Sequence, residues 1–185
     1  SHVVSNLLQR VTQCKSILMD AKADLLVYGN AERQVVEIAH RLAKGESVHD
    51  LKGIRGTVHF VKQVPLGWTE KDATHLEPPH EPSTPATIAL EPIEHPDLTQ
   101  TVIRLPDYDS LKDNPTLYAH ASRVMHRETN PGNAKPLIQR HGNREVWINP
   151  PTWPLTTPEL DGVFDLPYSR LPHTSYGNAN IPAFE

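Results

Sequence analysis

The hydrophobic period of the chain changes twice within its first 45 residues. Residues 3–18 repeat apolar side chains at helical spacing, which predicts an amphipathic helix with one apolar stripe. The run Leu25–Tyr28 is apolar without a break and ends at Gly29, a pattern typical of a strand covered on both faces. Helical spacing returns from Val35 to Leu42, and Gly45 follows as a stop signal. This succession predicts a helix, a strand, a tight turn and a second helix.

The turn after this strand is the first candidate binding position. Asn30 is predicted to cap the following helix, and Glu32 places an acid in its first turn. Ligands of parallel α/β sheets bind at the carboxyl ends of strands, so Gly29, Asn30 and Glu32 are candidate cofactor-binding residues. A purely structural turn is the alternative, because the segment lacks the GxGxxG pattern of dinucleotide-binding loops.

A single strand–helix unit cannot cover its own sheet. Residues 54–64, "IRGTVHFVKQV", predict one further strand with imperfect alternation. A parallel sheet needs several strands and helices on both of its faces. We therefore interpret residues 1–64 as the end of an α/β domain whose other strands lie upstream of this chain.

Proline and charge separate a middle segment from its neighbours. Residues 1–64 contain no proline, whereas residues 65–100 contain seven prolines, seven acids and one base. Proline removes backbone donors and like charges repel, so this segment is predicted to be a disordered, acidic, Pro-rich linker. The net charge of −4 and the pI of about 6.2 make nucleic acid an unlikely partner. The linker histidines lack compact ligand spacing, so no metal site is expected.

Residues 101–185 predict a small α+β segment. "TVIRLP" is a candidate strand, and residues 107–134 contain two helical pieces, of which the second is capped by Asn114 with Pro115 at its first position. Residues 137–140 and 145–149 are predicted to form a hairpin around Gly142. Thr156 and Glu159 have the spacing of a capping box.

The second of these helices carries a candidate anion site. Its predicted buried stripe consists of Leu117, Ala121, Val124 and Met125. His120, Arg123 and Arg127 follow one another at i, i+3 and i+7 and form a separate basic face. Together with Arg140 they are candidates for contacts with a phosphate, a carboxylate or a neighbouring domain. A solvated basic face is the alternative.

No local spacing assembles an active site. The chain contains no GxSxG, HExxH, CxxC or phosphate-binding loop motif. Its single cysteine, Cys14, excludes an internal disulfide and is interpreted as a small buried hydrophobic residue. No run of 18 apolar residues and no signal-peptide pattern occurs, so a cytoplasmic location without a membrane partner is expected.

Long stretches of the sequence resemble the YgiQ-type radical SAM proteins. They include "DAKADLLVYGNAERQVVEIAHRLAKGE", "TVIRLP" and "ETNPGNAKPLIQRHG", and the resemblance covers most of the chain outside the linker. It implies a doubly wound, cobalamin-binding-like domain upstream, of which residues 1–64 would be the last βα unit. It also implies a radical SAM partial barrel downstream, to which residues 101–185 would lead.

The resemblance implies cofactors for the full-length protein and none for this chain. A CxxxCxxC motif binds a four-iron, four-sulfur cluster, whose open iron holds S-adenosylmethionine. That motif is absent from these 185 residues. Related cobalamin enzymes often carry GEGE at the turn after the last strand. Here Asn30 and Ala31 replace the first Glu and the second Gly, so cobalamin binding is not carried over to this chain.

Two functional hypotheses follow. In the first, the chain is a fragment of a radical SAM enzyme of unknown substrate and links the upstream α/β domain to the catalytic barrel. In the second, it is a non-catalytic interaction or oligomerisation module, with the apolar stripe of residues 3–18 pairing two copies as a homodimer. The expected partners are therefore the flanking domains, the substrate or a second copy.

Overall fold

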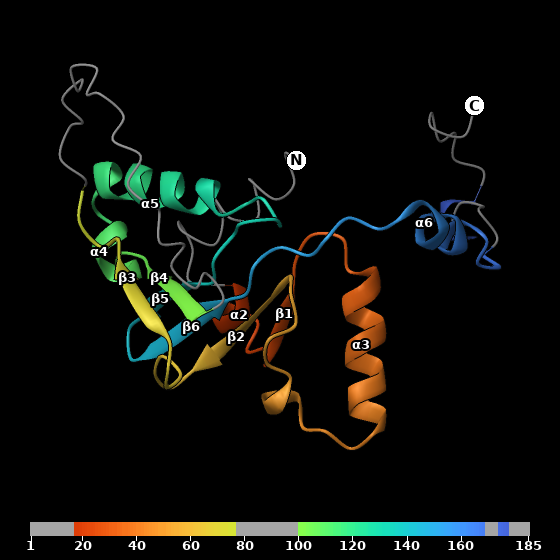
Figure 1. The fold of residues 1–185 in the computed structure, drawn as a ribbon. Coiled ribbons are helices and arrows are strands. Elements are labelled where there is room, and N and C mark those ends of the chain that lie inside the picture. The colour runs from red at the N-terminus through yellow and green to blue at the C-terminus, as the bar shows by residue number, and fades with distance from the viewer. Residues whose placement is uncertain (1–16, 77–99, 169–173, 178–185) are drawn as a thin grey trace, which may run out of the picture. The chain divides into compact units, whose positions relative to one another are not determined.

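The computed structural model describes residues 17–76, 100–168 and 174–177, and the chain divides into two units after Trp153. The first unit contains a six-stranded sheet in the order β1-β2-β6-β5-β4-β3 (Figure 1). Its strands are β1 (Leu25–Val27), β2 (Thr57–Val61), β3 (Thr69–Asp72), β4 (Thr101–Arg104), β5 (Leu137–His141) and β6 (Arg144–Ile148).

The sheet is mixed, which confirms an α/β fold but not the doubly wound parallel sheet. β1, β2, β6 and β5 are antiparallel neighbours, while β4 is parallel to both β5 and β3. β1 pairs antiparallel with β2, with Leu26 opposite Val58. A continuous apolar run indicates that a strand is covered, but it carries no information about the direction of its neighbour. The strand predicted within residues 54–64 and the hairpin after residue 137 are confirmed.

Helices accompany the sheet, and the described residues of the second unit contain one further helix and a 3-10 turn. The helices are α2 (Ile17–Asp20), α3 (Glu32–Ala43), α4 (Tyr108–Leu111), α5 (Pro115–Arg127) and α6 (Thr157–Phe164), with 3-10 turns at Val48–Asp50 and Thr174–Tyr176. α5 begins as predicted, because Asn114 Oδ1 accepts a 3.0 Å hydrogen bond from the Leu117 amide. At α6 the Thr156 amide donates to the Glu159 carboxylate at 2.7 Å, as the capping-box spacing indicates.

α3 departs from its prediction at its start and on its surface. Ala31 occupies the N-cap position without a side-chain cap, so the prediction that Asn30 caps the helix is wrong by one residue. Gly29, with φ +75°, turns the chain before the helix begins. The apolar residues Val35 and Val36 are 56% and 55% exposed, while the polar Gln34 is the buried residue of this helix.

Helices α2 and α5 cover one face of the sheet. The hydrophobic core there joins residues of both helices to residues of five strands or their ends. Its members are Leu18, Tyr28, Val58, Ile103, Leu105, Val124, Met125, Leu137, Val146 and Ile148. Figure 1 shows α5 running above the sheet. A smaller cluster on Val102, Ile138 and Trp147 is completed by Val61, Val64 and Trp68, which come from strands and loops.

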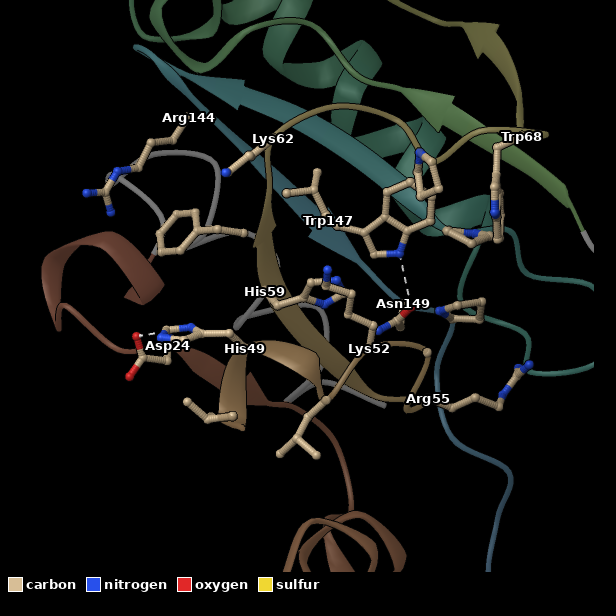
Figure 2. A pocket seen from close by; sticks show the side chains of 18 of the residues that line it. Asp24, His49, Lys52, Arg55, His59, Lys62, Trp68, Arg144, Trp147 and Asn149 are labelled. Carbon is tan, nitrogen blue, oxygen red and sulfur yellow. Dashed lines mark hydrogen bonds and ion pairs between the residues drawn. The ribbon is translucent and has the colours of Figure 1, made fainter. Parts of the chain in front are cut away.

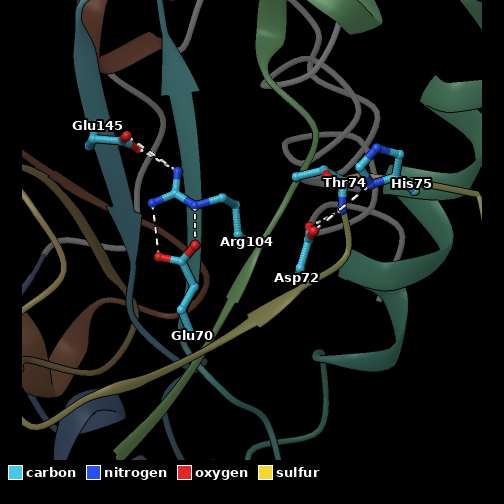
Figure 3. A network of polar contacts seen from close by, with 6 residues as sticks. All are labelled: Glu70, Asp72, Thr74, His75, Arg104 and Glu145. Carbon is cyan, nitrogen blue, oxygen red and sulfur yellow. Dashed lines mark hydrogen bonds and ion pairs between the residues drawn. The ribbon is translucent and has the colours of Figure 1, made fainter.

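The predicted linker contains a strand. Residues 69–72 form β3, which lies parallel to β4, so the prediction of a disordered segment is wrong at these positions. Arg104 of β4 pairs with Glu70 through Nε–Oε1 and Nη2–Oε2 distances of 2.5 and 3.0 Å, and its Nη1 lies 3.1 Å from Glu145 of β6 (Figure 3). Ion pairs that join three strands thus stabilise β3, in a segment whose composition predicted no secondary structure. Residues 77–99, the helix stripe before residue 17 and Cys14 lie outside the described residues.

Candidate functional site

A broad groove of about 2040 Å³ follows β2 and β6 (Figure 2). It is lined by the loop at residues 48–55, by β2 and the loop that follows it, and by residues of the 131–136 and 143–153 segments. Small-molecule pockets are usually about 300–1,000 Å³. The groove is therefore larger than a usual small-molecule pocket and has the size of an open docking surface.

The floor of the groove is a fixed array of polar and aromatic side chains. His59 of β2 lies opposite Trp147 of β6. Trp147 Nε1 donates to Asn149 Oδ1 at 3.0 Å (Figure 2). Asn149 Nδ2 in turn donates to Thr57 Oγ1 at 3.0 Å. Trp68 meets Trp147 edge-on, with ring centroids 5.0 Å apart. These contacts lock the rotamers of the floor.

Basic side chains dominate the lining of the groove. Among the described residues that line it, the lysines, arginines and acids are Lys22, Lys52, Arg55, Lys62, Arg144 and the single acid Asp24. This excess is local, because the whole chain carries a net charge of −4. A concave surface of one sign attracts ligands of the opposite sign. The groove is therefore suited to an anionic ligand.

The two arginines and the lysines of the groove have different roles. Arg55 Nε donates to the Pro151 carbonyl at 2.9 Å and Nη2 donates to the Pro131 carbonyl at 2.7 Å, while the guanidinium lies over the Trp153 ring. Arg144 lies over the Phe60 ring at 5.0 Å. Arg55 thus supports one wall, whereas Arg144 is exposed. Lys52 and Lys62 are exposed and present their charge to the groove.

His59 is the most constrained titratable group of the floor. Its side chain is 7% exposed, and its Nδ1 is buried without a hydrogen-bond partner among the described residues. Burial, and then the positive charge of Lys52, lowers the pKa of His59 to about 4, so the imidazole is neutral at pH 7. A buried polar atom without a partner costs about 1–3 kcal/mol.

The predicted turn residues lie at the carboxyl end of β1 but do not line the groove. Gly29 and Asn30 are exposed, and space around the Gly29 Cβ position is open. Glu32 is half-buried in the first turn of α3. Their proposed contact with a cofactor stays a prediction.

The predicted basic face of α5 is divided by the fold. His120 is 4% exposed, with Nε2 3.0 Å from the Ala73 carbonyl, and Arg123 Nη2 lies 3.4 Å from His120 Nδ1. Arg127 is exposed at the end of the helix. Arg140 Nε donates to the Gly142 carbonyl of its own hairpin at 3.0 Å. None of the four lines the groove, and their role at a domain junction stays a prediction.

Sequence analysis missed the groove because its residues come from segments far apart in the chain. Lys52, His59 and Trp147 share no motif, and the one local signal was a histidine inside an apolar strand. The described residues contain no group of three potential metal ligands. None of the helices in the described part of the chain is long and apolar enough to cross a bilayer.

Comparison with known proteins identifies the family. Residues 9–185 match the radical SAM N-terminal family, and the chain belongs to it. It is 46% identical to UPF0313 protein PA4928 of Pseudomonas aeruginosa, 51% identical to UPF0313 protein RPA0679 of Rhodopseudomonas palustris and 44% identical to UPF0313 protein YgiQ of Salmonella typhimurium.

These matches cover only part of each relative. Each covers 92% of this chain and 27%, 24% and 27% of the respective relative. The chain thus spans about a quarter of the length of these curated relatives. No solved structure matches it.

Proposed function

We propose that the full-length protein is a radical SAM enzyme and that this chain forms a non-catalytic part linking an upstream α/β domain to the catalytic barrel. The observation that carries the proposal is the family match over residues 9–185. The length of the relatives supports it, because about three quarters of each lies outside the matched region.

The residues of this chain do not fit the cofactors of that chemistry. A four-iron, four-sulfur cluster that keeps one iron open for S-adenosylmethionine needs three thiolates, and the sequence supplies only Cys14. The described residues also lack a group of three alternative ligands. We therefore assign the cluster and S-adenosylmethionine to the rest of the protein, and derive no catalytic step from this chain.

For the groove we propose binding of an anionic group between Lys52 and His59. The exposed ammonium of Lys52 supplies charge, and the buried imidazole of His59 supplies a nitrogen that has no hydrogen-bond partner among the described residues. Arg55 fixes one wall of the groove through its bonds to the Pro151 and Pro131 carbonyls. A phosphate or carboxylate of the substrate would satisfy this arrangement.

The enzymatic proposal is tested on the full-length protein. After anaerobic reconstitution with iron and sulfide, the protein should show iron–sulfur absorbance and an EPR signal on reduction. With a strong reductant it should cleave S-adenosylmethionine to 5′-deoxyadenosine. The 185-residue chain treated in the same way serves as the control and should remain without a cluster. A full-length protein that binds no cluster and cleaves no S-adenosylmethionine would remove this proposal.

The groove is tested by following the His59 imidazole by NMR as pyrophosphate is added to the chain. Bound anion should raise the pKa of His59 by about one unit or more, a tenfold gain in proton affinity. The Lys52→Gln variant should lose this response. Lys112→Gln removes an exposed lysine at the end of α4, outside the groove, and should retain it. An unchanged His59 pKa in pyrophosphate would rule out the anion site.

The second candidate function is a non-catalytic interaction module. It is favoured by the apolar residues that α3 exposes, of which Val35, Val36 and Leu42 are 56%, 55% and 43% exposed. Sedimentation of the 185-residue chain separates the two oligomeric outcomes. A concentration-dependent dimer supports self-association, and a monomer over the whole concentration range contradicts it.

A further inference from the structure

β1 is the end strand of the sheet in the described part of the chain, and one of its edges is open. β2 is its single neighbour there. The Tyr28 amide donates to the Gly56 carbonyl at 2.8 Å, on the β2 side. Backbone groups alternate in direction along a strand, so the N–H and C=O groups of Leu25 and Val27 face the open edge. Such an edge is a template for another strand.

Beside this edge lies an apolar groove of about 520 Å³ between β1 and α3. Its lining consists of Asp24, Leu25, Val27, Val35, Ile38, Ala39, Leu42 and Val48. Seven of these eight residues are apolar, and none of the seven is buried. An amphipathic helix is normally stabilised by burying this kind of stripe. The fold therefore presents two incomplete features at one place, an unpaired strand edge and an uncovered helix face.

We propose that a β-strand of the same polypeptide, from outside these 185 residues, adds to the open edge of β1. Alternate apolar side chains of this strand would fill the groove under Val35, Ile38 and Leu42, and its backbone would pair with Leu25 and Val27. The inference uses the greater length of the full protein and does not depend on its being a radical SAM enzyme.

The occupant follows from the chemistry of the site. Backbone groups that become buried need partners, and a strand supplies them along an edge where a helix cannot. Asp24 is the only charged residue among the described residues of the lining, so the facing side chains are expected to be apolar.

The source of the strand follows from chain length. The curated relatives extend far beyond the matched region, since it covers only 24–27% of their length. A second copy is the alternative occupant, and the concentration dependence of hydrogen exchange distinguishes it from a strand of the same polypeptide.

The test compares two substitutions on one helix of the full-length protein. Val35 and Val36 have the same side chain and nearly the same exposure, 56% and 55%, but only Val35 lines the groove. Val35→Glu should lower the Tm of the full-length protein by several degrees, and Val36→Glu should leave it almost unchanged. In the 185-residue chain the two variants should melt alike. Equal effects in the full-length protein would overturn the proposal.

Hydrogen exchange supplies a second readout that does not depend on a variant. The amides of Leu25 and Val27 should exchange at least about 100-fold more slowly in the full-length protein than in the 185-residue chain, as expected for edge groups that gain partners. Equal rates in the two proteins would contradict the added strand. If these amides exchange more slowly as the concentration of the 185-residue chain is raised, a second copy pairs with the edge, and the proposal is overturned.

Discussion

Two helices of similar length show how the same kind of pattern can end in opposite environments. α3 has 12 residues and α5 has 13, and both are amphipathic. Ala121 and Met125 of α5 are 0% and 3% exposed, whereas Val35 of α3 is 56% exposed. A hydrophobic stripe thus predicts that a helix face requires cover, and the rest of the polypeptide decides whether that cover lies within a given segment.

The largest expected effect comes from a charge on the covered helix. Val124→Asp places a carboxylate in the core, where Val124 is 7% exposed, and should destabilise the 185-residue chain by about 4 kcal/mol or more. Val36→Asp places the same charge on the exposed face of α3 and should cost less than about 1 kcal/mol. Urea denaturation followed by circular dichroism measures both. Similar losses would mean that the two helices are equally covered.

A smaller effect is expected from His59, on the sheet face away from α5. The folded pKa of about 4 lies below the unfolded value of about 6.5, so the unfolded chain binds more protons between these values. Folding stability should therefore fall as the pH is lowered from about 6.5 to about 4, by at most about 3 kcal/mol. His59→Gln should remove this part of the slope.

The remaining slope in His59→Gln is expected from His141, whose pKa is also lowered by burial, and at the acid end from Glu46, whose pKa is lowered by its hydrogen bond with Arg41. Denaturation midpoints at a series of pH values provide the measurement. A wild-type slope that persists in full in His59→Gln would show that His59 is not the group responsible.

Gly56 tests the contact between α3 and the sheet. It has φ +72°, and an added Cβ would lie 2.4 Å from Gln34 Nε2 and 3.3 Å from the Tyr28 carbonyl oxygen. Gly56→Ala should cost about 2 kcal/mol, from backbone strain and displacement of Gln34. Gly142→Ala has φ +60° and open space, so it measures the backbone part alone, about 1 kcal/mol. An equal loss of unfolding free energy in the two variants would show that the Gln34 side chain can move away from the added Cβ without destabilising the fold.

The smallest expected effect distinguishes the starts of the two helices. Asn114→Ala removes the side-chain cap of α5 and should cost about 1 kcal/mol. Asn30→Ala precedes α3, which has no side-chain cap, and should change the unfolding free energy by a few tenths of a kcal/mol at most. Thermal melts of the two variants decide the matter, and a larger loss for Asn30→Ala would contradict the helix start assigned to α3.

Sequence analysis predicted the parts of the fold that depend on neighbouring residues. The cap at Asn114, the capping box at Thr156 and the β5–β6 hairpin each arise within a few residues, and all three are found. The parallel pairing of β3 with β4 joins strands on either side of residues 77–99. Arg104 stabilises this pairing by contacts with Glu70 and Glu145, which lie 34 and 41 residues away from it in the sequence. Local propensity carries no record of such pairing.

The candidate sites divide in the same way. The turn at Gly29 was predicted from the order of strand and helix, and it lies where that order places it. The groove brings Lys52 and His59 to Trp147, which lies 88 positions after His59 on the neighbouring strand, and no local spacing could predict this. His120 was assigned to an exposed basic face and is instead bound to the Ala73 carbonyl, because β3 packs where the linker was expected.

Covalent footprinting of side chains tests most directly the claim that the exposed face of α3 is covered in the complete protein. Val35 and Leu42 should be labelled several-fold less in the full-length protein than in the 185-residue chain, while Val36, outside the groove, should be labelled alike in both. Equal labelling of Val35 and Leu42 in the two proteins would contradict the claim and leave α3 as a solvent-exposed helix.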